Sequence, residues 1–238
     1  MYRGSINRNL FSATYRSKST RFDVEKDQGL YDPEHPEIKI DPGPSPSTTG
    51  DLRIDFVPTF DFWVNKVSSE TEIIYGNAQS FHGPTPPRGN YIQITDERDE
   101  KSGWLLQMRQ EYQFQSEEEK ELRGAALQLD DSWVNSTKDL KYGPKVSKDV
   151  VRVRNIGETY NLAEAKKGTG HGTWEIVFGS SDSNKVNEKN TLEPRTDHNG
   201  KIILSDIYDR KPIYLNKALQ LVLPGLTQKE KEVPYQID

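Results

Sequence analysis

The chain has 238 residues, of which 32% are hydrophobic and 10% are aromatic. This length suits one large all-β domain with a tail, or two small domains, and it supports only a modest core. The formal charge of -5, from 32 basic and 37 acidic residues, excludes the strong positive field that would attract nucleic acid or an anionic membrane. Without cysteine the chain has no disulfide and no thiolate metal site, and no run of about 18 apolar residues could span a bilayer.

The first 50 residues differ in composition from the rest. Residues 1–22 contain five basic residues and no acidic one, which favours a solvated arm over a tail that binds polyanions. Residues 13–22 contain β-prone side chains and could add a strand to a sheet edge. Prolines 42, 44 and 46 favour an extended chain without backbone donors. We therefore expect an N-terminal arm and a proline-rich linker over residues 1–50, followed by a β domain over residues 51–238.

From residue 52 onward, short runs alternate apolar and polar residues between turn residues. This period of two, with frequent Gly and Pro, predicts a β-sandwich of Ig-like or Greek-key type with long loops. Only residues 116–121 and 162–167 have helical features. The long loops at 83–89 and 180–200 are places where function is often found. The expected strands are 52–56, 57–62, 72–75, 91–95, 103–109, 125–129, 150–154, 172–179, 201–204 and 218–225.

The strand expected at residues 103–109 has one apolar face. Trp104, Leu106 and Met108 share that face, because side chains two apart in a strand point the same way. The adjacent Leu106 and Met108 favour a core position for Trp104, as in other sandwiches. Alternatively, the indole of Trp104 stacks on a sugar ring while Gln107 and Arg109 bond its hydroxyls or the carboxylates of a peptide stem.

If Trp104 belongs to the core, ligand contacts must come from loops or from other aromatic residues. Trp63 and Trp133 are the candidates, because we expect both to be exposed. Trp174 alternates with Ile176 and Phe178 and is therefore a candidate core residue.

No motif in the sequence indicates catalysis. The four histidines have no metal-ligand spacing, and neither a phosphate-binding glycine loop nor a nucleophile elbow is present. Asp96, Asp99 and Glu100 could hold calcium, but the interleaved Arg98 and Lys101 favour a solvated turn. We therefore predict no cofactor, no metal and no catalytic residue. A carboxylate pair that acts on polysaccharide remains a weaker alternative, since sequence does not give the separation of two carboxylates.

A series of ordered landmarks runs along the chain from about residue 13 to the end. They are Asp41-Pro42-Gly43 and Gly50, then 51–62, 94–98, 103–106, 121–125, 172–174 with 178–179, and 223–225. In this order they resemble the WxL domain of low-GC Gram-positive bacteria. The family's first Trp-x-Leu motif corresponds to Trp104 and Leu106. Its second motif would close the domain, but residues 233–238 resemble only the lead-in to it, so we expect the last strand to be truncated or lost. Trp63 also departs from the family pattern, in which glycine commonly follows the phenylalanine that corresponds to Phe62.

The resemblance implies a secreted surface protein held non-covalently on peptidoglycan. It also implies assembly with other WxL proteins and with a membrane-anchored WxL-interacting protein. We therefore expect a non-enzymatic domain that binds peptidoglycan, without nucleic-acid binding or membrane insertion. The alternative is a protein-interaction module that docks the membrane-anchored partner, with a sheet edge as the contact. The candidate ligand residues are Trp104, Leu106, Gln107, Arg109, Trp63 and Trp133.

Overall fold

The computed structural model describes residues 2–6, 11–13, 29–65, 70–114, 121–182, 184–187 and 189–225. Within these ranges the regular structure consists of antiparallel strands and one 3-10 helix, η1 (Leu140–Tyr142), with no α-helix. None of the described residues belongs to a helix long and apolar enough to cross a membrane. The predicted all-β fold is confirmed.

Within the described residues the strands form four sheets. The first has the order β10 (Lys145–Val146), β12 (Thr159–Ala165), β7 (Trp104–Arg109) and β2 (Phe11–Ala13). The second has the order β3 (Leu52–Phe56), β6 (Asn90–Asp96), β13 (Gly172–Phe178) and β9 (Ser132–Asn135). The third has the order β11 (Val151–Val153), β8 (Ala126–Leu129), β15 (Tyr214–Leu223) and β14 (Leu192–Pro194), with β5 (Glu72–Asn77) also paired to β15. The fourth pairs β1 (Tyr2–Ile6) with β4 (Phe60–Asn65).

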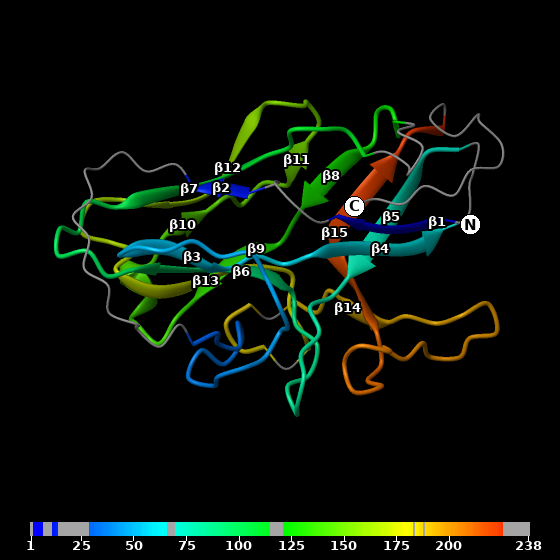
Figure 1. Ribbon diagram of the computed structural model, residues 1–238, viewed down its shortest axis with the longest axis horizontal. Coiled ribbons are helices and arrows are strands. Elements are labelled where there is room, and N and C mark those ends of the chain that lie inside the picture. The colour runs from blue at the N-terminus through cyan, green and yellow to red at the C-terminus, as the bar shows by residue number, and fades with distance from the viewer. Residues whose placement is uncertain are drawn as a thin grey trace.

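The main core lies between two layers of strands. In Figure 1, β7, β12 and β2 form an upper layer and β3, β6 and β13 a lower one, while β8, β15 and β5 continue the fold to the right. Trp104 and Leu106 enter the core from β7, and Trp174 and Phe178 enter it from β13. The sandwich prediction and the core position of Trp174 are therefore confirmed.

A second, smaller core covers the opposite face of the β3-β6-β13-β9 sheet. Residues 29–41 cross this face, where the Tyr31 N–H donates to Gln93 Oε1 at 2.9 Å and Asn135 Nδ2 donates to the Pro33 carbonyl at 3.0 Å. Residues 29–41 are therefore part of the folded β domain. The buried side chains of this second core are Phe56, Phe81, Tyr91, Trp133 and Val177, and Leu30 and Ile40 pack against them.

The proline-rich segment continues along the edge of β3. Ser45 Oγ accepts a hydrogen bond from the Val57 N–H at 3.0 Å, and Thr48 Oγ1 accepts one from the Ile54 N–H at 2.8 Å. These contacts cover an edge that would otherwise be open to another strand. Serine and threonine side chains of this proline-rich segment thus satisfy part of the backbone of β3 and of Val57, while the domain boundary at residue 50 stays a prediction.

Two local predictions were also wrong. Residues 162–167 were expected to be helical, but most of them belong to β12, which pairs with both β7 and β10. Residues 201–204 form isolated bridges instead of a strand, with Ile202 opposite Thr196 and Leu204 opposite Pro212. The added strand expected at 13–22 and the helical features at 116–121 fall almost wholly outside the described residues. The C-terminal lead-in at 233–238 lies entirely outside them.

A buried carboxyl group makes the second core sensitive to pH. Glu175 on β13 is 1% exposed, and among the described residues its Oε2 has no hydrogen-bond partner. Burial raises the pKa of Glu175 well above its ordinary 4.5, and the nearby Asp55 and Asp32 raise it further. The folded state therefore keeps a proton that the unfolded state releases above about pH 4.5, so this group favours folding at low pH.

Replacing Glu175 by glutamine is expected to reduce the loss of stability with rising pH. In the wild type the contribution of Glu175 to the free energy of unfolding declines as pH rises from its ordinary pKa through its raised pKa. Glutamine does not titrate and gives no such decline. At alkaline pH the variant is expected to be more stable than the wild type, because the wild type must then bury an ionised carboxylate whereas glutamine stays neutral. Urea unfolding of both proteins from acid to alkaline pH measures this, and identical pH profiles would contradict the assignment.

Candidate functional site

The Trp-x-Leu pair of β7 lies inside the sandwich. Trp104 is 7% exposed and Leu106 is fully buried. Trp104 Nε1 donates to the Gly170 carbonyl at 2.9 Å, which satisfies the one polar group of the indole. The core interpretation of Trp104 is therefore confirmed, and neither side chain reaches a surface from which it could touch a sugar.

Gln107 and Arg109 point away from the core on the other face of β7. Gln107 Nε2 donates to Asn161 Oδ1 on β12 at 2.8 Å. Arg109 Nε lies 2.9 Å from Glu111 Oε1 in an exposed ion pair. Both residues are accessible, as alternation predicts, but the structure separates them from Trp104 by placing them on the opposite face of the strand.

Trp133 is 5% exposed, so its prediction as an exposed aromatic is wrong. It lies in the second core on β9, and its Nε1 donates to the Gly179 carbonyl at 2.9 Å. This burial could not be predicted, because Leu30 and Ile40, which pack against this core, come from the segment that resembles a linker in sequence.

A groove with a volume of about 560 Å³ lies beside Trp63, and we call it the Trp63 groove. Its size falls within the range of about 300–1,000 Å³ that is typical of small-ligand sites. Among the described residues that line it, Trp63 is the one candidate ligand residue from the sequence. The lining residues are Pro42, Pro44, Phe56, Val57, Thr59, Asp61, Trp63, Asn77, Ala78, Gln79, Ser80, Leu204, Ser205, Asp206, Ile207, Tyr208 and Ile213.

Hydrogen bonds fix the walls of the groove to one another. Tyr208 Oη donates to the Pro42 carbonyl at 3.0 Å, which ties residues 204–208 to the proline-rich segment. The Gly83 N–H donates to Asp209 Oδ2 at 3.0 Å, and Lys211 Nζ donates to the Phe81 carbonyl at 2.8 Å. The groove is therefore formed by segments that are distant in sequence but joined by direct bonds.

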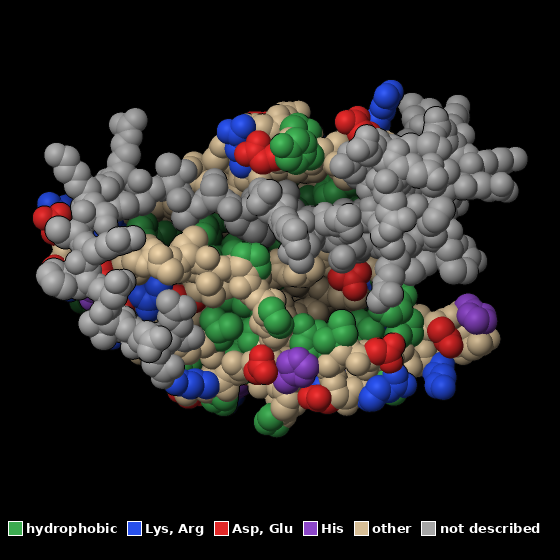
Figure 2. All heavy atoms as spheres, in the orientation of Figure 1, with side chains coloured by type: hydrophobic (Ala, Val, Ile, Leu, Met, Phe, Trp, Pro, Cys, Tyr) green, Lys and Arg blue, Asp and Glu red, His purple; other side chains and the backbone are tan. Residues whose placement is uncertain are grey.

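Figure 2 shows hydrophobic side chains gathered in a band below the centre of one face of the molecule. Acidic, basic and histidine side chains lie along the lower border of this band. In the groove itself, Ile207 is 69% exposed and Trp63 is half-buried. Exposed apolar side chains next to polar ones are typical of a binding surface.

The polar side chains around Trp63 are held in fixed positions. Asp61 Oδ1 accepts from the Trp63 N–H at 2.8 Å, and Asp61 Oδ2 accepts from Asn77 Nδ2 at 2.9 Å. The guanidinium of Arg195 lies over the Trp63 ring, 5.9 Å from its centroid, and Arg195 Nε donates to Asn77 Oδ1 at 2.8 Å. Burial lowers the pKa of Arg195, while the neighbouring Asp61 raises it. The indole is thus positioned by a chain of contacts from β4 through β5 to Arg195.

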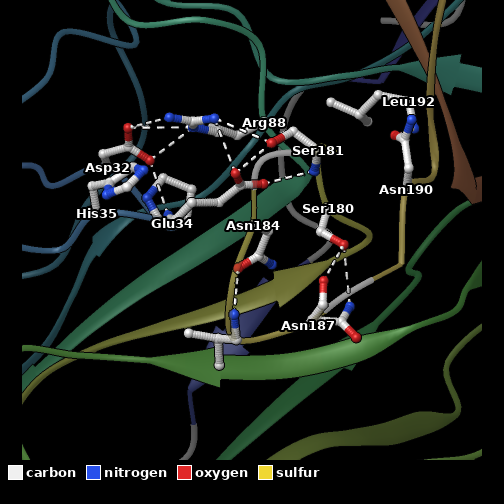
Figure 3. A network of polar contacts seen from close by, with 12 residues as sticks. Asp32, Glu34, His35, Arg88, Ser180, Ser181, Asn184, Asn187, Asn190 and Leu192 are labelled. Carbon is white, nitrogen blue, oxygen red and sulfur yellow. Dashed lines mark hydrogen bonds and ion pairs between the residues drawn. The ribbon is translucent and has the colours of Figure 1, made fainter.

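Three buried charged side chains lie elsewhere, in the cluster drawn in Figure 3. Arg88 binds Asp32 through Nε at 3.0 Å and Nη2 at 3.0 Å, and it binds Glu34 through Nη1 at 2.9 Å. The Ser181 N–H donates to Glu34 Oε1 at 2.7 Å. These contacts satisfy the charges internally and join residues 29–41 to the loops at 79–88 and 180–184. We therefore interpret the cluster as a structural clamp.

Comparison with known families decides the class of protein. The family model described as "WxL domain surface cell wall-binding" matches residues 13–238, which is almost the whole chain. The chain belongs to the WxL family. WxL is a family of surface domains that bind the cell wall, so the domain has an attachment role at the cell surface, and the family is not one of enzymes. No curated protein and no solved structure matches the chain at a significant level.

The structure changes which residues of this WxL domain are candidates for wall binding. The Trp-x-Leu motif contributes to the core, whereas Trp63 lines a groove. Asp61, Asn77 and Asp206, three of the polar residues of that groove, could not be identified from the sequence. They have no shared spacing, and only the tertiary fold brings residues 59–63, 77–80 and 204–208 together.

Proposed function

We propose that this WxL domain attaches to the cell wall by binding peptidoglycan in the Trp63 groove. The observation that supports this most strongly is that the groove combines a half-buried indole with fixed polar side chains. An indole can cover the apolar face of a sugar ring, while amide and hydroxyl groups bond the hydroxyls at its edge. The other tryptophans among the candidates, Trp104 and Trp133, are buried and cannot make such contacts.

Replacing Ile207 by aspartate is expected to weaken binding to purified peptidoglycan at least about tenfold, a change of about 1.4 kcal/mol. Ile207 lines the groove and is largely exposed, so the change places a charge in the site with little cost to folding. The matched control is Ile156→Asp, because Ile156 is also exposed, at 45%, and lies outside the Trp63 groove.

Co-sedimentation with purified peptidoglycan at several protein concentrations measures both variants. Weaker binding of Ile207→Asp alone supports the groove. Equal binding by the wild type and by both variants would contradict the groove as the contact. Absence of sedimentation of the wild-type protein would contradict peptidoglycan as the ligand.

The N-terminal strands favour a second candidate, docking of a membrane-anchored WxL-interacting protein. β1 pairs with β4 from Tyr2 opposite Asn65 to Ile6 opposite Phe60, and β2 places Phe11 opposite Met108 of β7. All of β1 and the first two residues of β2 precede the family match at residue 13, and these strands extend two sheet edges of the domain. An edge that takes up one extended segment can take up another by the same backbone pairing.

Deleting residues 1–13 is expected to tighten binding of the extracellular part of such a partner several-fold, because the edges of β4 and β7 lose their present neighbours. Biosensor measurement with the immobilised partner tests this. A partner that binds the full chain and the deletion variant equally well would contradict strand addition. A partner that binds neither would contradict the docking function itself.

A further inference from the structure

Trp63 has a backbone conformation that disfavours a large side chain. Its φ is +59°, in the left-handed region where a Cβ atom crowds the backbone and where glycine is favoured. In the ladder with β1, Trp63 lies opposite Gly4, beside a register shift between Gly4 and Ser5. The bond from the Trp63 N–H to Asp61 holds this local turn. Strained residues of this kind cluster at sites of function, where the surrounding structure maintains them.

The strain places the indole where it becomes part of the groove. Arg195 lies over the ring, and Arg195 is itself fixed by Asn77 Oδ1 at 2.8 Å and by the Tyr75 carbonyl at 2.9 Å. A planar group held in this way loses little freedom when a ligand stacks on it, which favours binding. The geometry therefore provides a positioned aromatic platform at a point where the backbone alone would favour glycine.

The polar groups of the groove suit a neutral ligand. The described lining residues include the carboxylates of Asp61 and Asp206 but no Lys or Arg. The two nearby guanidinium groups are already engaged, because Arg210 pairs with Asp206 and Arg195 is bound by Asn77 and the Tyr75 carbonyl. The rest of the polar lining is neutral: Thr59, Asn77, Gln79, Ser80, Ser205 and Tyr208. A peptide stem with free carboxylates, or a polymer of phosphates, would therefore find no cation among the described lining residues. A neutral sugar with hydroxyl and acetamido groups would meet donors and acceptors suited to it.

We propose that Trp63 determines the ligand preference of the groove by stacking on a neutral N-acetylated amino sugar of the glycan backbone, and that the groove rejects the peptide stem. This inference rests on the proposed attachment to peptidoglycan and specifies the part of that polymer that is bound. The sugar ring covers the indole, its acetamido group bonds the Asn77 or Gln79 side chain, and Asp61 accepts from a hydroxyl.

Calorimetric titration with a tetrasaccharide of N-acetylglucosamine tests the proposal on the full chain. Trp63→Gly is expected to weaken binding at least about tenfold, and Trp63→Phe by less. Glycine suits the observed φ, so Trp63→Gly is expected to fold with a melting temperature within a few degrees of the wild type. The matched control is Tyr142→Ala, since Tyr142 is likewise an aromatic residue beside a cation, with Lys141 Nζ 4.8 Å from its ring centroid, and is exposed outside the Trp63 groove. The binding of this variant is expected to be unchanged.

A second titration uses a synthetic stem peptide without sugar, for which no binding is expected. Equal binding of the tetrasaccharide by the wild type and by folded Trp63→Gly would overturn the proposal, and so would binding of the stem peptide in place of the sugar. Sedimentation with whole peptidoglycan separates this failure from failure of the proposed function. A protein that sediments with peptidoglycan but does not bind the tetrasaccharide overturns the sugar preference and leaves wall attachment intact.

Discussion

Replacing Arg88 by methionine is expected to lower the free energy of unfolding by about 3–5 kcal/mol, because it leaves two carboxylates buried without their cation. Arg88 is 4% exposed, Asp32 2% and Glu34 6%. Methionine preserves most of the apolar volume of arginine but provides none of its donors. The loss of the clamp is also expected to free residues 29–41 from the face of the sheet that contains Tyr91.

Urea unfolding followed by circular dichroism measures the effect of Arg88→Met. The matched control is Arg109→Met, in which an exposed arginine loses its pair with Glu111; a change of at most about 1 kcal/mol is expected there. Adding Asp32→Asn and Glu34→Gln to Arg88→Met removes the unpaired charges and is expected to restore part of the stability. A change for Arg88→Met no larger than that for Arg109→Met would contradict the clamp.

Trp104→Ala is expected to destabilise the domain by about 3–5 kcal/mol without removing a ligand contact. The change leaves a cavity between β7 and the facing sheet and leaves the Gly170 carbonyl without its donor. Gly170 shows how close the packing is, since a Cβ atom there would lie 2.7 Å from Trp104 Nε1. Trp104→Phe keeps much of the ring volume and is expected to cost less.

Stability and binding are measured separately for the Trp104 variants. Unfolding in urea is expected to show the loss, while the fraction that remains folded is expected to sediment with peptidoglycan as the wild type does. A Trp104→Ala protein of normal stability that no longer binds peptidoglycan would contradict the core assignment and would restore the Trp-x-Leu motif as the contact.

Alternation predicted the strands of the sandwich because burial follows it directly. In β7 the residues at positions 104, 106 and 108 are buried and those between them are not. The same rule failed for β12, where a register shift between Asn161 and Ala163 places two successive apolar residues, Leu162 and Ala163, in the core. Alanine, glutamate and lysine around them favour a helix locally, and pairing with β7 overrides that preference.

The N-terminal segment could not be predicted because its contacts are polar and distant in sequence. Asp32 and Glu34 look like solvated residues between prolines, and nothing near them in sequence shows that Arg88 and Ser181 will surround them. The burial of Trp133 is likewise not predictable, because Leu30 and Ile40, which pack against its core, come from this same segment. The Trp63 groove is a more extreme case, since its walls come from four separate segments. Only the tryptophan itself was identifiable from the sequence.

Chemical-shift perturbation in nuclear magnetic resonance with soluble peptidoglycan fragments maps the binding surface residue by residue. The largest shifts are expected at the backbone amides of Asp61, Trp63, Asn77, Ser205 and Asp206. Perturbation concentrated at Gln107 and Arg109 on the outer face of β7, with the groove unaffected, would contradict binding in the Trp63 groove.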